Sequence, residues 1–180
     1  MIRLFVAIQL PETVRERLAS LCTGVPGARW TPAENMHLTL RFIGEVGVAD
    51  AGDMDHALTR VQAPGFTLAF NRVDSFGSKG KARAIWAGVS SNPALEHLHD
   101  KIESALVRAG LPPEGRKFVP HVTLARLKSV TPARAADYLE GHGPIVSEPV
   151  AVREFTLFSS FLASSGAIHT VEAVYPLDGD

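Results

Sequence analysis

The chain has 180 residues, of which 46% are apolar and 21% are charged, and its formal net charge is -1. This composition is typical of a domain with a buried core and excludes a disordered tail. Proteins that coat RNA or DNA through many phosphates carry a basic surplus, so we expect any nucleic-acid contact to be local, at an end or a single nucleotide.

The N-terminal region predicts an apolar strand followed by a helix. Residues 3–10 are largely apolar on both faces, as in a central strand. Pro11 can begin the helix because its missing N–H would be unpaired at a first helical position anyway. Val14, Leu18 and Leu21 follow at helical spacing, which gives this helix one buried side.

A half-buried strand is expected next, over residues 36–43, ending at Gly44. Side chains alternate between the two faces of a strand, which places His37, Thr39 and Arg41 on one face and apolar residues on the other. This strand therefore presents polar groups to one side only.

The remainder of the chain mixes helices with strands. Asn92-Pro93 is typical of the start of a long helix, and residues 119–127 predict a strand with His121 and Thr123 on one face. Helices are also expected at residues 49–61 and 132–139, and strands at 66–76, 82–89, 150–161 and 169–177. Strands that are neighbours in the chain often pair, so this order predicts an α+β fold with mainly antiparallel sheets.

One short pattern occurs twice, as His37-Leu38-Thr39-Leu40 and His121-Val122-Thr123-Leu124. The two copies are about half the chain apart, and each lies on an expected strand. A duplicated element at this spacing predicts two similar lobes related by an approximate two-fold axis, with both strands facing a central cleft.

Two histidines on opposite sides of a phosphate can divide the proton transfers of hydrolysis. One imidazole takes a proton from the attacking water, and the other gives a proton to the leaving oxygen. Threonine hydroxyls can donate to the non-bridging phosphate oxygens, and a nearby arginine adds a permanent positive charge. The duplicated motif therefore predicts phosphoryl chemistry.

Other interpretations of the histidines are weaker. A single buried histidine is often a core residue, but the repeat also duplicates a threonine on the same face. A zinc site is poorly supported, because neither motif has a third histidine, a cysteine or paired carboxylates beside it. The other five histidines show no such pattern; in His169-Thr170 the two side chains point to opposite faces, so it is not a third copy.

The chain resembles the 2H phosphoesterase superfamily and, within it, the RNA 2',3'-cyclic phosphodiesterase family, historically called 2'-5' RNA ligases. The resemblance covers nearly the whole chain. The residues that carry it are Arg3-Leu4-Phe5-Val6-Ala7-Ile8, Pro11, Trp30, His37-Leu38-Thr39-Leu40-Arg41-Phe42-Ile43-Gly44, Ala84-Ile85-Trp86-Ala87-Gly88-Val89 and Phe118-Val119-Pro120-His121-Val122-Thr123-Leu124-Ala125-Arg126.

The resemblance implies one bilobal domain over residues 1–180, with no metal or other cofactor. It implies hydrolysis of a terminal 2',3'-cyclic phosphate on RNA 3' ends or nucleotides, with a 2'-phosphate as product. Carried over by position, His37 is the proton donor and His121 the proton acceptor. Thr39, Thr123 and Arg126 are the expected phosphate-binding residues. Strand alternation places Arg126 opposite His121 unless a bulge or strand end turns it inward.

Two other functions stay open. The reverse reaction would join a cyclic phosphate end to a 5'-hydroxyl as a 2'-5' linkage, using the same residues. The second alternative is a nucleotide-binding module without catalysis. Such a module needs positive charge and hydrogen-bond donors but not two titrating histidines, so the intact motifs argue against it. The aromatic residues Phe5, Trp30, Phe70 and Trp86 are either stacking partners for a terminal base or core residues.

Location and assembly are also predicted. Cys22 is the single cysteine, which favours a reducing compartment because no internal disulfide can form. The apolar run at the N-terminus is too short for a signal peptide, and no run of about 20 apolar residues suggests a membrane span. We therefore expect a cytoplasmic protein, and a self-contained cleft predicts a monomer.

Overall fold

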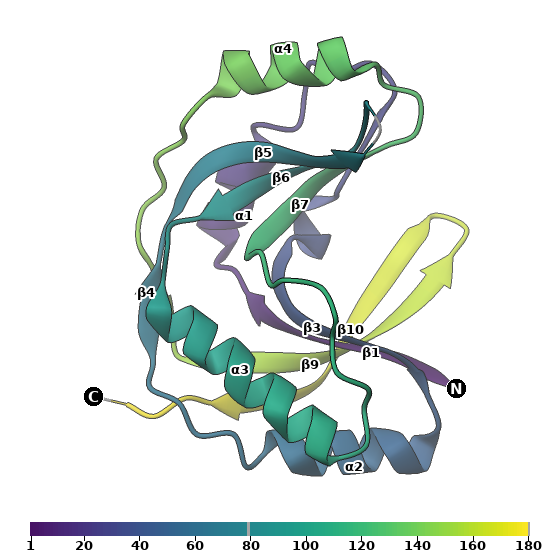
Figure 1. Cartoon of the computed structure of the whole chain (residues 1–180), viewed down its shortest axis with the longest axis vertical. Helices are drawn as coiled ribbons and strands as arrows, with labels where there is room; N and C mark the ends of the chain where they lie inside the picture. The colour runs from purple at the N-terminus through teal and green to yellow at the C-terminus, as the bar shows by residue number, and fades with distance from the viewer. Residues whose placement is uncertain (79, 180) are drawn as a thin grey trace.

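The computed structural model describes residues 1–78 and 80–179, and it contains two four-stranded antiparallel sheets (Figure 1). Sheet A has the order β10 (Gly166–Pro176), β9 (Glu154–Ala163), β1 (Ile2–Gln9) and β3 (His37–Val46). Sheet B has the order β2 (Ala28–Trp30), β7 (His121–Leu127), β6 (Lys81–Val89) and β5 (Phe70–Ser78). The short strands β4 (Phe66–Leu68) and β8 (Val150–Val152) pair separately.

Helices lie outside the two sheets. They are α1 (Glu12–Ala19), the 3-10 turn η1 (Ala33–Asn35), α2 (Val48–Leu58), α3 (Pro93–Arg108) and α4 (Pro132–His142). Figure 1 shows α4 beyond sheet B at one end of the molecule, and α2 and α3 beyond sheet A at the other. The sheets therefore lie between the helices.

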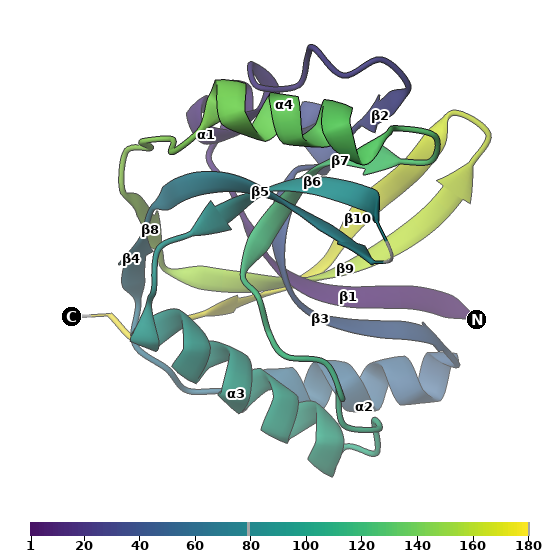
Figure 2. The same cartoon turned by 45° about the horizontal axis from the view of Figure 1, so that its top comes forward.

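Each sheet and its helices form one lobe, and the chain crosses between the lobes. In both directions, the segment that follows a strand of one sheet packs against the other lobe. Helix α3 follows β6 of sheet B, yet it packs against β3 of sheet A and against α2. Helix α1 follows β1 of sheet A, and the residues after it reach sheet B. There the Cys22 thiol lies 3.9 Å from the carbonyl oxygen of Leu124, and the Tyr138 hydroxyl of α4 donates to the Leu21 carbonyl at 2.5 Å. Figure 2 shows α1 and α4 on the side of sheet B. This exchange ties the lobes together.

The apolar pattern of the strands explains the core. In β1, Leu4, Val6 and Ile8 are buried in one large cluster that extends across both lobes. The alternate residues Phe5 and Ala7 face the other way and form a second small cluster with Phe158. A central strand that is apolar on both faces, as predicted, therefore supports two separate apolar surfaces.

The predicted fold class is confirmed: the chain forms an α+β structure with antiparallel sheets. Helix α3 begins as expected, with the Asn92 side chain accepting a hydrogen bond from the Leu95 N–H at 3.1 Å. The prediction that Gly44 ends its strand is wrong. Gly44 has a φ of 94°, which only glycine adopts without strain, and the strand continues past it to Val46.

Other boundaries also differ. The expected strand at residues 66–76 is divided into β4 and β5, and the expected strand at 150–161 into β8 and β9. Helix α4 continues to His142 instead of ending at Leu139. Strand β2 was not predicted, because three residues are too few to show a periodicity. Within residues 1–78 and 80–179, none of the helices is both long and apolar enough to cross a bilayer.

Candidate active site

The two predicted histidines begin two strands that touch each other. His37 is the first residue of β3 in sheet A, and His121 is the first residue of β7 in sheet B. Strands β3 and β7 are in contact although they belong to different sheets. The fold therefore brings together two segments that lie half a chain apart.

Each histidine shares a sheet face with the threonine of its motif. In sheet A, His37 pairs with Gln9 and Thr39 pairs with Ala7. In sheet B, His121 pairs with Gly88 and Thr123 pairs with Trp86. Directly paired residues of antiparallel strands project to the same side, and so do residues two apart on one strand. We call these two surfaces the motif face of sheet A and the motif face of sheet B.

A bulge follows each motif. Val6 pairs with Arg41 and the next residue, Ala7, pairs with Thr39, so Leu40 is the extra residue in β3. An extra residue reverses the alternation beyond it. Arg41 consequently points away from the motif face of sheet A, and the next residue, Phe42, points toward it.

The same irregularity occurs in β7. Ile85 pairs with Ala125 and Trp86 pairs with Thr123, so Leu124 is the extra residue. Arg126 then pairs with Ala84, two residues from Trp86, and lies on the motif face of sheet B. The bulge therefore places Arg126 on the same face as His121, whereas simple alternation along the strand would place it on the opposite face.

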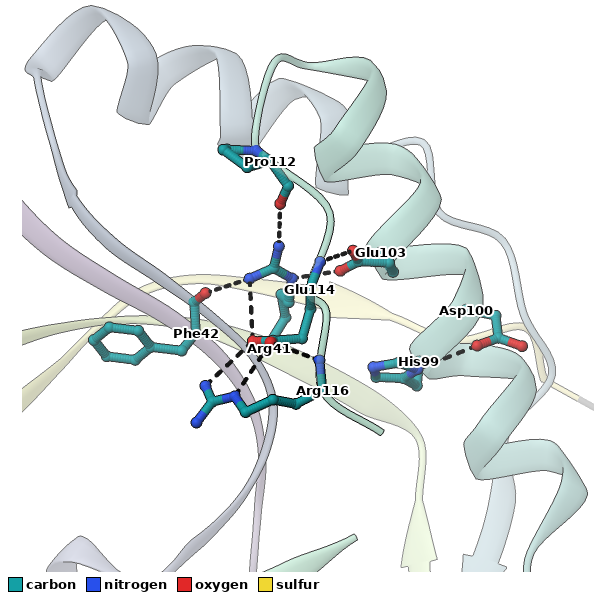
Figure 3. Close-up of polar contacts among 8 residues, drawn as sticks. All are labelled: Arg41, Phe42, His99, Asp100, Glu103, Pro112, Glu114 and Arg116. Atoms are coloured by element: carbon teal, nitrogen blue, oxygen red, sulfur yellow. Dashed lines mark hydrogen bonds and ion pairs between the residues drawn. The ribbon is translucent and has the colours of Figure 1, made fainter. Parts of the chain in front are cut away.

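The expectation that Arg41 lies beside His37 is wrong. Its side chain is only 7% exposed and forms an ion pair with Glu103 of α3 (Figure 3). The guanidinium also donates to the carbonyl oxygens of Phe42, at 2.7 Å, and Pro112, at 2.6 Å, and lies 4.0 Å from the Glu114 carboxylate. Arg41 therefore connects sheet A to α3 and to the loop after it, on the face opposite the motif.

Arg126 has a neighbour that the sequence reasoning missed. Arg29 of β2 is its direct cross-strand partner, so both guanidinium groups belong to the motif face of sheet B. Both residues are exposed, and in the part of the chain that the structure describes no carboxylate forms an ion pair with either. Like charges directly opposite each other destabilise a sheet, so this pair is suited to an anionic ligand.

His121 is held in one tautomer. Its Nδ1 lies 2.6 Å from the carbonyl oxygen of Val119, and because a carbonyl only accepts, Nδ1 carries the proton and donates. Nε2 is thereby left free to accept a proton. Burial lowers the pKa of His121, while the hydrogen bond to Val119 acts in the opposite direction. His121 is therefore mainly a neutral base near neutral pH.

Aromatic rings support the His121 imidazole. The ring centroid of Trp86 lies 5.5 Å from it, and that of Phe76 lies 4.9 Å from it, edge-on. Gly88, the cross-strand partner of His121, leaves the room for this packing: a Cβ there would lie 2.8 Å from Cζ3 of Trp86 and 3.0 Å from the Arg72 side chain. Trp86 itself is 4% exposed, so its main role is packing rather than open stacking.

His37 lies in an apolar environment. Its ring stacks on Phe5, with centroids 4.8 Å apart, and the ring of Phe158 is 5.8 Å away. Burial, the largest cause, and the nearby His169 together lower the pKa of His37 to about 4, against the opposing effect of the Asn35 backbone. His37 is therefore mainly uncharged near neutral pH.

The structure places a third histidine here that the sequence reasoning set aside. His169 of β10 lies 5.1 Å from His37, centroid to centroid, and 5.0 Å from Phe5. It has no His-x-Thr pattern, but the β9–β10 hairpin brings it to the motif of a distant strand. No signal in the sequence indicates this contact, because it depends on the pairing of β9 with β1 and β10.

The aromatic candidates divide between the core and the motif faces. Phe70 is 1% exposed and is a core residue, and Trp30 packs against Tyr138 at 5.8 Å. The exposed rings on the motif faces are instead Phe42, 49% exposed, and Phe76, 37% exposed. The position of Phe42, five residues after His37, matches that of Arg126 after His121, a spacing that the sequence does contain.

Neither of two surface hollows includes a motif histidine. One, of about 370 Å³, is lined mainly by residues 8–11 and 151–154, and the other, of about 450 Å³, lies between the β5–β6 turn and α4. Among the described residues, no group of three or more His, Cys, Asp or Glu side chains is arranged to hold a metal. Metal independence stays a prediction.

The family model described as LigT like phosphoesterase matches the chain over residues 8–86 and 88–169, and each stretch contains one His-x-Thr motif. The chain belongs to the LigT-like phosphoesterase family. This membership confirms the family predicted from the two motifs.

LigT-like relatives span almost the whole chain. The RNA 2',3'-cyclic phosphodiesterase of Thermotoga maritima is 33% identical over 94% of this chain and 92% of its own, and that of Escherichia coli K12 is 33% identical over 93% and 92%. The crystal structure of E. coli LigT complexed with 3'-AMP covers 98% of both chains with a TM-score of 0.78 and 29% identity. A crystal structure from Thermus thermophilus covers 99% of both chains, with a TM-score of 0.78 and 27% identity.

Proposed function

We propose that this protein hydrolyses the terminal 2',3'-cyclic phosphate of RNA to a 2'-phosphomonoester, using two histidines as general acid and base. The observation that carries the proposal is the pair of contacting strands, each with a histidine and a threonine on one face, in a chain of the LigT-like phosphoesterase family. The relatives named RNA 2',3'-cyclic phosphodiesterase at 33% identity support the same substrate class.

We assign the base role to His121. Its protonated Nδ1 is engaged by Val119, so Nε2 is free to take a proton from water. The oxygen of that water forms a bond to phosphorus as the bond from phosphorus to the 3' oxygen breaks. His37 then gives its proton to the 3' oxygen, which leaves a 3'-hydroxyl and a 2'-phosphate.

His37 must carry a proton to act as the acid, although it is uncharged in the free protein near neutral pH. A cyclic phosphate carries one negative charge. Its arrival beside the imidazole favours the imidazolium, because an opposite charge at short range raises the pKa of a histidine. Substrate binding is therefore expected to charge the donor.

Three further residues are proposed to bind the phosphate. Thr39 and Thr123 share the motif faces with the histidines, and their hydroxyls can donate to non-bridging oxygens. Arg126 lies farther along the motif face of sheet B and supplies a forked, permanently charged donor. Arg29 beside it extends the positive charge.

We also propose that residues 1–180 act as a single domain, with sheet A and sheet B each supplying one motif. We further propose that the protein is a cytoplasmic monomer and needs no metal. Its proposed substrates are RNA 3' ends or nucleotides that bear the cyclic phosphate. The single cysteine, Cys22, supports a reducing compartment, and two imidazoles can divide the proton transfers without a metal ion.

The same groups could catalyse the reverse reaction, in which a 5'-hydroxyl replaces water. Water at its bulk concentration favours hydrolysis unless a second RNA end is held firmly, and a net charge of -1 offers little attraction for one. A non-catalytic binding module is less well supported, because it needs donors and positive charge but not an imidazole with a free nitrogen.

The test is an assay with EDTA present on a short RNA that ends in a 2',3'-cyclic phosphate. His37→Ala and His121→Ala are measured beside wild type, with His97→Ala, an exposed histidine of α3, as the matched control. The phosphate position in the product is identified by phosphorus NMR.

We expect wild type and His97→Ala to form the 2'-phosphate and each motif variant to lose about 10²–10⁴-fold in turnover. A 3'-phosphate product would show that the 2' oxygen, and not the 3' oxygen, is the leaving group. Wild-type activity in either motif variant would contradict the mechanism, and failure of wild type on RNA and cyclic mononucleotides alike would favour the binding module.

A further inference from the structure

His169 is a titratable group in the site that the proposed mechanism does not use. It lies on β10, where it pairs with Ser160 of β9, and its ring meets His37 edge-on at an interplanar angle of 65°. Its Nδ1 is buried and has no hydrogen-bond partner among the described residues. A buried polar nitrogen without a partner is uncommon and calls for an explanation.

Among the residues that the structure describes, the side chains that contact the two imidazoles are aromatic or neutral. Phe5 of β1 and Phe158 of β9 contact both rings, with the Phe158 centroid 6.5 Å from that of His169. Gln9, the cross-strand partner of His37, directs its amide to the Thr156 hydroxyl at 3.1 Å. Within the described chain, neither histidine has a carboxylate within 4.0 Å.

Asn35 of η1 connects the segments that carry the two histidines. Its side-chain amide donates to the carbonyl oxygen of Ala167 at 3.0 Å, and Ala167 lies two residues before His169 on β10. Asn35 itself lies two residues before His37, the first residue of β3. This hydrogen bond therefore ties the segment that leads into His37 to the strand that carries His169.

Two imidazolium ions whose ring centroids are 5.1 Å apart, beside aromatic rings and with no described carboxylate within 4.0 Å of either, repel each other. Protonating one therefore suppresses protonation of the other, as in a pair of carboxylates that share one proton. An anionic phosphate beside the pair removes this penalty for the imidazole nearest to it.

We propose that His169 is a positioning residue for His37: the two imidazoles carry at most one positive charge between them, and the bound phosphate draws the additional proton onto His37. The role rests on the proposed function, in which His37 is the acid. It makes the donor a strong acid that is charged only when substrate is present. The proton comes from solvent, so ligand binding is accompanied by proton uptake.

The experiment follows His37 directly by NMR, through its ring Cε1–H resonance, assigned by comparison with His37→Ala. The pH titration is measured in wild type, His169→Phe and His169→Gln, with His97→Gln as the matched control. The phenylalanine variant keeps the packing on Phe5, and the glutamine variant keeps a polar group. Each titration is repeated with inorganic phosphate as the probe, and thermal melting confirms that each variant is folded.

We expect the titration midpoint of His37 to rise by about one pH unit in both His169 variants and to stay unchanged in His97→Gln. Phosphate should raise the midpoint in wild type more than in the His169 variants. In the pH profile of kcat/KM, the limb whose midpoint matches that of His37 should shift by the same amount. A midpoint that is the same in wild type and both His169 variants would overturn the proposal.

This outcome is independent of the proposed function, because the resonance of His37 can be followed in a protein with no detectable turnover. If wild type hydrolyses the cyclic phosphate but His37 titrates without regard to His169, only the present inference fails. If the midpoint moves as expected and no substrate is hydrolysed, the coupling stands and the proposed function fails.

Discussion

Phe42 occupies in sheet A the position that Arg126 occupies in sheet B. Each lies five residues after its motif histidine, and a bulge at Leu40 or Leu124 turns each onto the motif face. The two lobes thus repeat the same backbone irregularity with different chemistry: an exposed aromatic ring on one side and a guanidinium on the other. On the proposed RNA substrate, this asymmetry predicts that the terminal base contacts one sheet and the phosphate the other.

Arg126→Gln should lower kcat/KM on cyclic-phosphate RNA by about 10–100-fold, because a hydrogen bond to a charged group is worth about 1.5–3 kcal/mol. Arg83→Gln is the matched control: Arg83 is exposed on β6 and precedes Ala84, so it points to the opposite face. Steady-state kinetics at two salt concentrations check this prediction. Equal losses in the two variants would indicate a general charge effect instead of a binding site.

Thr39→Val and Thr123→Val should each reduce turnover by about ten-fold while leaving the melting temperature nearly unchanged. The reason is that both threonines are half-buried residues, and no hydrogen bond within the described structure uses their hydroxyls. Thr170→Val, an exposed threonine of β10, serves as control. A large fall in melting temperature with normal turnover per folded molecule would assign the threonines to stability instead.

Arg41→Gln should destabilise the fold without removing the active-site chemistry. Loss of the guanidinium leaves the Glu103 carboxylate and the Pro112 carbonyl without their partner, which costs about 3 kcal/mol for a largely buried pair. Denaturant unfolding measures this loss, and turnover is compared per folded molecule. Arg3→Gln, which breaks the exposed pair with Glu45, should cost less than about 1 kcal/mol.

A stable Arg41→Gln protein with reduced kcat would instead show that Arg41 reaches the phosphate. That result would contradict the register of β1 and β3, because Arg41 pairs with Val6, whose side chain is completely buried on the face opposite the motif.

His37 should make the stability of the fold depend on pH. Its pKa is about 4 in the folded protein against an ordinary value of 6.5, so the unfolded chain binds more protons between these values. The free energy of unfolding should therefore fall as the pH is lowered from about 6.5 to about 4, by at most about 3 kcal/mol from this residue.

Denaturant unfolding of wild type and His37→Phe over this pH range tests the effect. The phenylalanine keeps the packing on Phe5 and does not titrate, so its profile should be flatter. His97→Gln should follow the wild-type profile, because His97 is exposed on α3. Parallel curves for wild type and His37→Phe would show that His37 does not carry the pH dependence.

The sequence by itself determined the fold class, the two motif strands and the placement of each histidine beside its threonine. These depend on local patterns: an alternation of period two, and a motif repeated half a chain apart. Residues 37–39 and 121–123 lie before either bulge, so simple alternation predicts their faces correctly.

Only the tertiary structure decided the faces of the residues beyond Leu40 and Leu124. A bulge is set by the hydrogen-bonded register with a neighbouring strand, which a local pattern does not contain, and it reversed the faces of Arg41 and Arg126. The same holds for Arg29, on a strand of three residues, and for His169. His169 reaches His37 only because β9 pairs with β1 and carries β10 with it, a contact between segments 132 residues apart that is also bridged by the hydrogen bond from Asn35 to Ala167.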